Sequence, residues 1–534
     1  MLMYIFGVIL LGIVVFIHEL GHFLFAKLFN VEVTAFSIGF GKPIIKWKKG
    51  DTEYRLSMIP LGGYVKMTGE TPNDERELTD DEIAVSYSHK KWWQKVVIAL
   101  AGPLFNIILA VFVFLFVSFY EHTAPAAVVE FLNPGGAAAT AGMEEGDRIV
   151  NINGNDISVW EDISSNINSS SGKCENTNVT VKSYKSGKLK KLTIKPVPGT
   201  YKDAFNEVQT RCEIGVARLP RDTVIALSSN VEGLKSGDKI LAVNNQDVDR
   251  FYQIKHHLSH KPVTQIKILR NKKELVIKFD NVTDLSQKIL YGGTMLSEVQ
   301  EDSFSRSVGF MKNDVILSVN GKKISIPYQF YSALSKLKEN DDATIEIVRN
   351  ENPETINFKV IIEEKDNAYT GVKERNVKWG AKFNFDYSVP EIMAKRANPA
   401  LFSINYAFGQ TWNMIDMTLK GFWYLVSGKM SAKSLGGPIM IFDISKRAAE
   451  AGLKHFLFIL AVISINLGII NLFPVPILDG GHIVMYTFEG VSGKKIPISI
   501  KEKILTVGFV LLMLLMAFAI FNDFSRYFSI FTGA

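Results

Sequence analysis

The 534-residue sequence is poor in cysteine and has little net charge of either sign. Its only two cysteines, Cys174 and Cys212, exclude a disulfide-dense scaffold and a zinc module built on four cysteines. A formal net charge of +6 is too small for this length to indicate a nucleic-acid-binding protein. Disorder and a collagenous fibre are also excluded, because 47% of the residues are hydrophobic and 21% are charged. This composition suggests several domains, some soluble in lipid and some in water.

Charge is absent from four long stretches of the chain, namely residues 1–17, 96–120, 456–478 and 504–522. A helix needs about 20 apolar residues to cross a membrane, and the first stretch stays apolar through residue 29 around one His-Glu pair. We therefore predict a polytopic α-helical membrane protein with four transmembrane helices, within residues 1–29, 96–120, 456–478 and 504–522. A signal peptide is the alternative for the first stretch. The lack of a basic start and of a small-residue cleavage site favours a retained span.

Lysine and arginine are unevenly distributed among the loops. Residues 25–95 contain 11 of them, and the short loop 479–503 contains four lysines. By the positive-inside rule both loops are cytoplasmic, which makes 30–95 a cytoplasmic loop. Both chain ends and residues 120–455 are then expected on the outer side of the membrane.

Residues 400–426 form a fifth long stretch that is rich in hydrophobic residues. It contains Gln410, Asn413, Asp416 and Lys420, whose side chains are costly at membrane depth. Its aromatic residues suit an amphipathic helix that lies in the membrane interface. We predict the interfacial position, and a fifth span is the alternative.

A 14-residue pattern occurs three times without gaps between the second and third uncharged stretches, at 141–154, 232–245 and 308–321. Each copy has Gly at its second position, Asp at its seventh and Asn at its thirteenth. The apolar residues that alternate after the Asp predict a half-buried strand, and the Asn predicts a tight turn behind it. The copies begin 91 and 76 residues apart, so they indicate three tandem domains.

This pattern resembles the α+β PDZ domain in its permuted bacterial arrangement. We place the three PDZ-like domains at 124–216, 217–288 and 289–389. PDZ domains bind an extended peptide in a groove by strand addition, and a spacer or size filter is the alternative role. Both cysteines fall within the first domain, where a disulfide and two unpaired thiols are equally compatible with the sequence.

The motif His18-Glu19-Leu20-Gly21-His22 ends the first uncharged stretch. Residues four apart share one face of a helix, so both imidazoles can reach one metal ion. Glu19 is placed to take a proton from the attacking water. A pair of interfacial histidines without a metal is the alternative, but three ionisable groups in an apolar helix are costly without a purpose.

A catalytic zinc site needs a third protein ligand and an open position. Asp479 closes the third uncharged stretch, in the sequence NLFPVPILDGGH at 471–482. Pro474 and Pro476 forbid a regular helix there, and unwound backbone at membrane depth is tolerated only around a cavity. The predicted topology places Asp479 and the two histidines on the same, cytoplasmic side.

HELGH together with NLFPVPILDGG resembles the site-2 protease family of intramembrane zinc metalloproteases. With PDZ domains between the second and third spans, the chain resembles the bacterial regulator of sigma-E protease type. Further matches are FSIGFGKP, IPLGGYVKM, AGPLFN and SLGGPIMI, at 36–43, 59–67, 101–106 and 434–441. The family pattern has one or two PDZ domains, whereas three signatures occur here.

The resemblance implies a role for each matching position. His18, His22 and Asp479 would bind zinc, and Glu19 would be the general base. Asn471 would hold the substrate or its oxyanion, with a helix-packing amide as the alternative. The remaining matches imply substrate-binding residues, in a membrane-associated β-hairpin with a turn at Gly62-Gly63 and in the proline-rich stretch: Gly62, Gly63, Tyr64, Val65, Pro474 and Pro476. Residues 398–447 match amphipathic interfacial helices.

The function that the resemblance implies is cleavage of transmembrane segments in regulated intramembrane proteolysis at the bacterial inner membrane. Substrates would be single-span proteins, such as an anti-sigma factor already trimmed by another protease or remnant signal peptides. Two other functions are alternatives. A non-catalytic scaffold predicts an incomplete metal set, and the set here is complete. A metal transporter predicts acidic or histidine residues in several spans, and the second and fourth have none.

Overall fold

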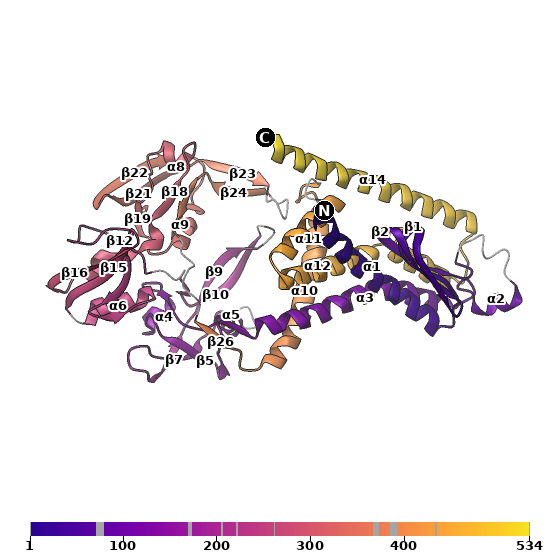
Figure 1. The fold of residues 1–534 in the computed structure, drawn as a ribbon, viewed down its shortest axis with the longest axis horizontal. Coiled ribbons are helices and arrows are strands. Elements are labelled where there is room, and N and C mark those ends of the chain that lie inside the picture. The colour runs from indigo at the N-terminus through magenta and orange to yellow at the C-terminus, as the bar shows by residue number, and fades with distance from the viewer. Residues whose placement is uncertain are drawn as a thin grey trace. The chain divides into compact units, whose positions relative to one another are not determined.

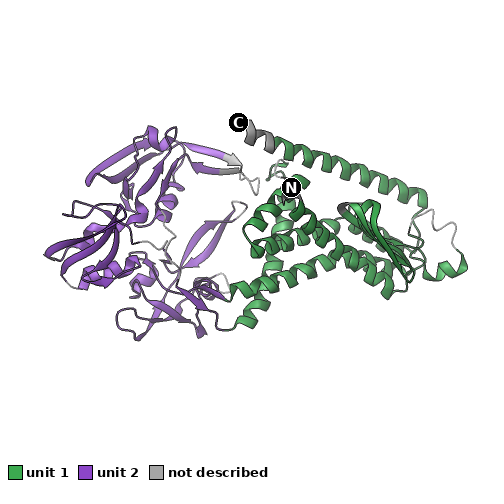
Figure 2. Ribbon diagram, in the orientation of Figure 1, with its two compact units in different colours: residues 1–122, 368–371, 398–534 green, residues 123–367, 372–397 purple. Residues whose placement is uncertain are grey.

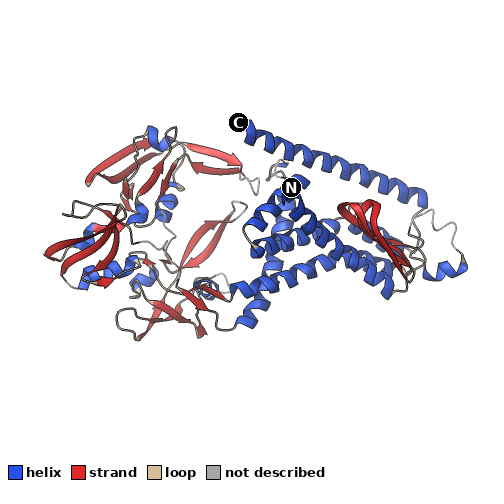
Figure 3. Cartoon of the chain, in the orientation of Figure 1, coloured by secondary structure: helices blue, strands red, loops and turns tan. Residues whose placement is uncertain are grey.

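A computed structural model describes residues 2–70, 79–168, 173–203, 205, 207–219, 223–260, 262–366, 373–384, 392–432 and 435–532. The chain divides into two compact units, coloured separately in Figure 2. The first contains residues 1–122 and 398–534, and the second contains most of the residues between them. Helices dominate the first unit and strands dominate the second (Figure 3).

Four helices of the first unit are long and apolar enough to cross a membrane, judged by length and composition over the described residues. They are α1 (Leu2–Leu28), α3 (Trp92–Ser118), α12 (Leu453–Asn471) and α14 (Ile498–Thr532). They coincide with the four uncharged stretches, as the sequence predicts. The third ends at Asn471, seven residues before the end of its uncharged stretch, because Pro474 and Pro476 follow.

The remaining elements of the first unit are shorter or less apolar. They are β1 (Val33–Lys49), β2 (Thr52–Met67), α2 (Asp80–Val85), the 3₁₀ turn Phe119–Glu121, α10 (Pro399–Val426), α11 (Pro438–Glu450) and α13 (Asp479–Ser492). Helix α10 is not among the helices that qualify as spans. Its Ala407 packs into the core of the helices, whereas Trp412 and Trp423 are exposed. This distribution agrees with an amphipathic helix.

Helices α1, α3 and α12 form the core of the first unit (Figure 1). Leu10, Val14, Phe114 and Ile465 are fully buried there. The core is apolar on all sides, so an ionisable group at its edge needs a partner.

The segment 33–67 folds into a sheet whose strands bend. Residues 35–38 of β1 pair with 53–56 on one side and with 63–66 on the other. The chain reverses at Gly50, which has a φ of +62°. Residues 53–56 run parallel to 35–38 and residues 63–66 run antiparallel to them, so the chain reverses again between residues 56 and 63. The predicted turn at Gly62-Gly63 lies at the end of this second reversal. Gly62 has a φ of +133° and provides a bend inside β2, a conformation that only glycine adopts without strain.

The second unit contains three repeats, each with a four-stranded antiparallel sheet (Figure 1). The three sheets have the strand orders β6-β5-β7-β8, β14-β13-β15-β16 and β20-β19-β21-β22. The first strand of each 14-residue pattern is the second strand of its sheet, and Asn153, Asn244 and Asn320 behind these strands have φ values of 50°, 47° and 49°. The predicted strand and turn are therefore present in all three copies.

The first repeat contains β4 (Phe131–Leu132), α4 (Ala137–Thr140), β5 (Arg148–Ile152), β6 (Asn155–Asp156), α5 (Trp160–Ile167), β7 (Thr177–Lys182), β8 (Leu189–Ile194), β9 (Val197–Lys202), β10 (Val208–Glu213) and β11 (Val216–Ala217). The second contains β12 (Ile225–Leu227), β13 (Lys239–Val243), β14 (Gln246–Asp247), α6 (Phe251–His260), β15 (Val263–Arg270), β16 (Lys273–Val282), α7 (Leu285–Lys288), β17 (Ile289–Tyr291) and the 3₁₀ turn Gly292–Thr294.

The third repeat contains β18 (Leu296–Val299), α8 (Phe304–Ser307), β19 (Val315–Val319), β20 (Lys322–Lys323), α9 (Pro327–Leu334), β21 (Asp342–Arg349), β22 (Asn352–Lys359), β23 (Ile362–Asp366), β24 (Lys373–Val377) and β25 (Ala381–Phe383). Each repeat has a hydrophobic core of its own. The repeats are therefore structural domains, since each buries its own apolar face.

Cys174 and Cys212 are joined by a disulfide in the first repeat, with their Cα atoms 5.4 Å apart. Of the two alternatives that the sequence left open, the structure contains the bonded one. The bond ties the segment before β7 to β10.

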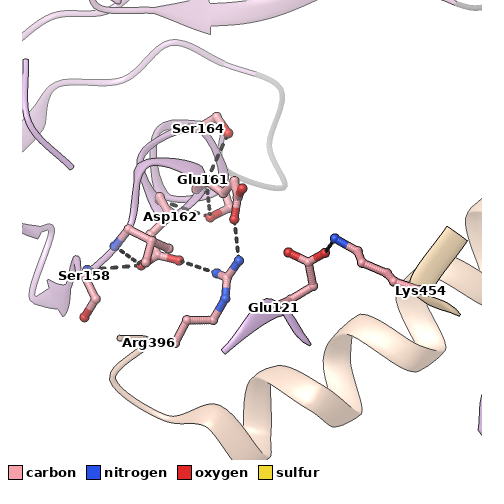
Figure 4. Close-up of polar contacts among 9 residues, drawn as sticks. Glu121, Ser158, Glu161, Asp162, Ser164, Arg396 and Lys454 are labelled. Carbon is pink, nitrogen blue, oxygen red and sulfur yellow. Dashed lines mark hydrogen bonds and ion pairs between the residues drawn. The ribbon is translucent and has the colours of Figure 1, made fainter. Parts of the chain in front are cut away.

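The chain enters and leaves the second unit side by side. Strand β3 (Thr123–Pro125) pairs with β26 (Met393–Lys395). The next residue, Arg396, forms ion pairs with Glu161 and Asp162 of α5 (Figure 4). Both segments through which the chain enters and leaves the second unit are therefore fixed to the first repeat.

Each repeat has an aspartate at the same position of the 14-residue pattern, and these aspartates give a test of the packing. Asp314 is 1% exposed and pairs with Arg349 at 2.7 Å, whereas Asp147 is 2% exposed and accepts only backbone N–H groups among its described hydrogen bonds. Burial raises the pKa of the Asp147 carboxyl, so its charged form is disfavoured in the folded state. Asp314→Asn should lower the free energy of unfolding by about 2 kcal/mol, because Arg349 loses its buried carboxylate and keeps the more exposed Glu354 as its partner.

Asp147→Asn is the matched comparison and should cost less, because it loses one of two backbone N–H bonds but no ion pair with an arginine. Pulse proteolysis of the whole protein in urea measures both variants. Equal losses of stability in the two variants would contradict the different pairing of Asp314 and Asp147.

Candidate active site

Two histidines of α1 and one aspartate of α13 lie together in the first unit. The ligand atoms of His18, His22 and Asp479 all lie within 4.8 Å of one another. The two Nε2 atoms are 3.2 Å apart. Asp479 Oδ2 lies 3.2 Å from His18 Nε2, and Oδ1 lies 3.5 Å from His22 Nε2. Catalytic zinc sites have three such nitrogen and oxygen ligands and an open fourth position, so this donor set fits a zinc ion.

The loop between α12 and α13 brings Asp479 to the histidines. Residues 472–478 are irregular, and α13 begins at Asp479 itself. The first turn of α13 then lies tightly against this loop. A Cβ on Gly480 would be 2.2 Å from the carbonyl oxygen of Leu472, and one on Gly481 would be 2.3 Å from that of Val475. Only glycine fits at these two positions, so the GG of the motif is required by the close approach.

Helix α3 forms another wall of the site through a glycine contact. A Cβ on Gly21 would be 2.4 Å from the carbonyl oxygen of Ala101, and a Cβ on Gly102 would be 2.3 Å from His22 Nε2. His22 Nδ1 lies 2.8 Å from the carbonyl oxygen of Ile98. This contact fixes the ring with Nε2 toward Asp479. Sequence reasoning gave AGPLFN no role beyond the family match.

Two amide side chains contact His18. Asn471, at the end of α12, has Nδ2 3.3 Å from His18 Nε2, so this predicted residue does lie at the site. Asn106 of α3 has Nδ2 3.2 Å from His18 Nδ1 and is 0% exposed. Sequence reasoning missed Asn106. The available signal was an amide in the middle of an uncharged stretch, where an unsatisfied polar group is costly.

The side chain of Glu19, on α1, lies against strand β2. A Cβ on Gly63 would be 2.9 Å from Glu19 Cγ and 3.0 Å from Val15 Cγ1, so the strand lies directly on the helix here. The backbone N–H of Val65 interacts with the Glu19 carboxylate. Two of the four predicted hairpin residues, Gly63 and Val65, are therefore next to the predicted base.

The other predicted substrate-binding residues have different neighbours. Tyr64 stacks on Phe40 with ring centroids 6.3 Å apart, and a Cβ on Gly62 would collide with the same ring. Successive residues of a strand face opposite sides, so Tyr64 lies on the sheet face away from Gly63. Pro474 is exposed in the loop 472–478, and Pro476 lies against Gly508 of α14.

The second unit contains a cavity of about 370 Å³ in its first repeat. One wall is α5, with Ile163 and Ser164, and the facing wall is the segment 211–217 around Gly215. Tyr328 and Gln329 of the third repeat close part of its border. A groove between a helix and the edge of a strand is the position where PDZ domains add a peptide strand.

In the other two repeats an aromatic side chain of the helix contacts aromatic side chains at or near the strand. Phe251 of α6 contacts Tyr291 of β17 with centroids 5.4 Å apart. Phe330 of α9 contacts Phe383 of β25 at 5.2 Å and Trp379 at 4.9 Å. Helix and strand therefore touch each other through aromatic side chains there, whereas in the first repeat the cavity occupies part of the space between α5 and residues 211–217.

Comparison with known proteins gives matches along the whole chain. Residues 6–515 match the sequence profile of peptidase family M50. A Neisseria meningitidis protein named as a zinc metalloprotease is 29% identical over 98% of this chain and 99% of its own length. The regulator of sigma E protease of Haemophilus influenzae is 29% identical over 97% and 98%. The Escherichia coli regulator of sigma-E protease RseP is 26% identical over 97% of each chain.

A solved PDZ domain of an SdrC-like protein from Listeria monocytogenes matches 17% of this chain and 92% of its own, with 18% identity and a TM-score of 0.14. At that score the likeness supports no conclusion about function.

The contact between Gly102 and His22 gives a test of the site that does not depend on activity. Gly102→Ala should reduce zinc affinity about tenfold or more, because the added methyl group displaces the imidazole and disturbs its orientation. Competition with a chromophoric chelator on the purified protein measures the change. Gly409→Ala in α10 is the control, since a Cβ there meets nothing within 4 Å. A normal zinc affinity for Gly102→Ala would contradict the described packing.

Proposed function

This chain belongs to peptidase family M50, the site-2 protease family of zinc metalloproteases, and from that premise we propose that it cleaves transmembrane segments of single-span membrane proteins. The observation that carries the proposal is the meeting of His18, His22 and Asp479 at the end of an uncharged helix. Three ionisable side chains at this depth are costly unless they bind a common ion.

We propose that the three residues are the zinc ligands, through His18 Nε2, His22 Nε2 and a carboxylate oxygen of Asp479. Zinc at this position supplies a Lewis acid for the scissile carbonyl and lowers the pKa of the attacking water. Glu19 takes the proton from that water and returns it to the leaving amine. The support for this role is its place beside His18, on the same turn of α1.

Asn471 is proposed to donate its amide N–H to the carbonyl oxygen of the substrate as negative charge develops on it. Its Nδ2 lies 3.3 Å from His18 Nε2, within one side chain of the ligand set. The helix-packing alternative is less well supported. The neighbouring half-buried amide, Asn466, has a packing partner in Thr418 at 2.6 Å, whereas Asn471 contacts a ligand.

The substrate must unwind before cleavage, because the carbonyl groups of a helix are hydrogen-bonded and crowded. Residues 63–66 pair on one side with residues 35–38 of β1, and Gly63 lies on Glu19. A substrate in extended form that adds to this part of β2 is brought past Glu19, and its freed backbone groups find partners on the strand. This supports Gly62, Gly63, Tyr64 and Val65 as a substrate-binding segment. The unwound stretch with Pro474 and Pro476 is proposed as the other border.

We propose an orientation in which the active site faces the cytoplasm and the repeats lie outside the inner membrane, on the basis of the lysine and arginine distribution. The four spans would be α1, α3, α12 and α14, with α10 and α11 in the interface. Two relatives are named regulators of sigma E, which supports a substrate of the anti-sigma-factor class already trimmed by another protease. Remnant signal peptides are a second substrate class.

For the three repeats we propose a division of roles. The first binds the trimmed end of a substrate's outer domain in the cavity between α5 and residues 211–217. The second and third, whose helices and strands touch through aromatic rings, act as a spacer that excludes bulky outer domains.

Replacement of the proposed base separates catalysis from metal binding. Glu19→Gln should lower the rate of cleavage of a transmembrane substrate at least 1000-fold, while the zinc content stays at that of the wild type. His22→Ala should abolish both. Cleavage is followed by gel analysis and zinc by atomic absorption. Residual cleavage by Glu19→Gln above a tenth of the wild-type rate would reject Glu19 as the base.

Filling the cavity of the first repeat tests its role. Ser164→Trp places a large ring in the cavity and should slow cleavage of a substrate with a trimmed outer domain about tenfold, because it removes a docking site. A substrate without any outer domain should be cleaved at the wild-type rate. Ser165→Trp, on the same helix but not among the cavity residues, is the control. Equal rates for the two variants on both substrates would assign the first repeat to the spacer as well.

A further inference from the structure

Asn106 of α3 is a fully buried amide next to His18. Its Nδ2 lies 3.2 Å from His18 Nδ1, and its Oδ1 has no hydrogen-bond partner among the described residues. A buried amide oxygen without a donor is unfavourable, because no hydrogen bond offsets its loss of hydration. Asn106 is therefore an energetically unfavourable buried polar group next to a proposed metal ligand.

The ligand geometry determines where the protons of the two histidines lie. Both Nε2 atoms face Asp479, so each neutral ring that binds a metal through Nε2 has its hydrogen on Nδ1. For His22 this hydrogen has an acceptor, the carbonyl oxygen of Ile98 at 2.8 Å. For His18 the corresponding hydrogen is directed at the amide of Asn106.

With the amide NH₂ facing His18, two hydrogen-bond donors would meet, while the amide oxygen would have no donor to accept from. The oxygen and nitrogen of an amide have nearly the same shape, and their assignment follows from the hydrogen bonds. A half-turn of the amide brings Oδ1 to Nδ1–H, which relieves both faults at once. We propose that Asn106 is a positioning residue for zinc: its side-chain oxygen accepts Nδ1–H of His18 and holds Nε2 toward the metal. The proposal rests on His18 being a zinc ligand.

The surroundings of Asn106 hold it in place. Ser464 of α12 donates its hydroxyl to the backbone oxygen of Asn106 at 2.8 Å. Gly468, one turn farther along α12, is so close that a Cβ would lie 3.4 Å from Asn106 Cβ. Helix α12 also carries Asn471, so His18 is in contact with one amide at each ring nitrogen. Partners at the outer nitrogen of a ligand histidine commonly change metal affinity by 10- to 100-fold.

Two substitutions of similar size distinguish positioning from packing. Asn106→Leu fills the same space without an acceptor and should weaken zinc binding 10- to 100-fold. Asn106→Asp keeps an acceptor for Nδ1–H and should retain zinc affinity within about threefold of the wild type. The measurement is zinc competition with a chelator on the whole protein in detergent, together with the visible absorption spectrum after cobalt substitution, which reports ligand geometry.

A purely structural role predicts the opposite order, since leucine suits an apolar core and a buried carboxylate does not. Asn106→Leu with wild-type zinc affinity, or Asn106→Asp with the weaker binding of the two, would overturn the proposal. If Asn106→Leu does not fold, the Asp variant decides alone: retained zinc supports the proposal and lost zinc overturns it.

Asn466 provides the matched control within the same helix core. It pairs with Thr418 and is not among the residues that contact a histidine, so Asn466→Leu should leave zinc affinity unchanged. His18→Ala separates this inference from the proposed function. If His18→Ala keeps zinc, the proposed metal site itself is wrong. If His18→Ala loses zinc and Asn106→Leu does not, only the role of Asn106 is wrong.

Discussion

The organisation of the first unit follows from the cost of placing ionisable groups at the edge of an apolar helix core. His18, Glu19 and His22 lie on a helix whose preceding 17 residues are uncharged, so each needs a partner. Asp479 supplies one partner for both imidazoles, at 3.2 and 3.5 Å. The loop 472–478, the two glycines of α13 and the close contact of α1 with α3 all serve to bring this carboxylate and the rings together.

Glycine contacts allow the helices to approach closely enough for that arrangement. Gly21 lies against the backbone of Ala101, Gly102 lies against His22, and Gly468 lies against Pro103 and Asn106. Small residues at helix contacts are the common means of close packing where apolar burial gives little driving force between helices. The consequence for function is rigidity. Each ring of the ligand pair is held at both nitrogens, by Asp479 on one side and by α3 on the other.

The second unit shows how one sequence pattern gives three folds of the same type with different surfaces. The strand order and the turn at the Asn position are the same in all three repeats. The space between helix and strand depends on side chains outside the pattern. Ile163 and Ser164 line a cavity in the first repeat, whereas Phe251 and Phe330 contact aromatic rings at or near the strand in the others. The same fold therefore presents different side chains between helix and strand.

The sequence by itself predicted the four apolar helices, the three repeats and the candidates His18, Glu19, His22 and Asp479, because each depends on a local pattern: uncharged length, a recurring motif, or spacing on one helix face. Asn471 was predicted through the family resemblance alone. It did not determine the pairing of 35–38 with both 53–56 and 63–66, the disulfide, the cavity of the first repeat, or the place of Asn106. Each of these depends on which segments meet across tens or hundreds of residues. Asn106 and His18 are 88 residues apart, and only the packing of α3 on α1 makes them neighbours.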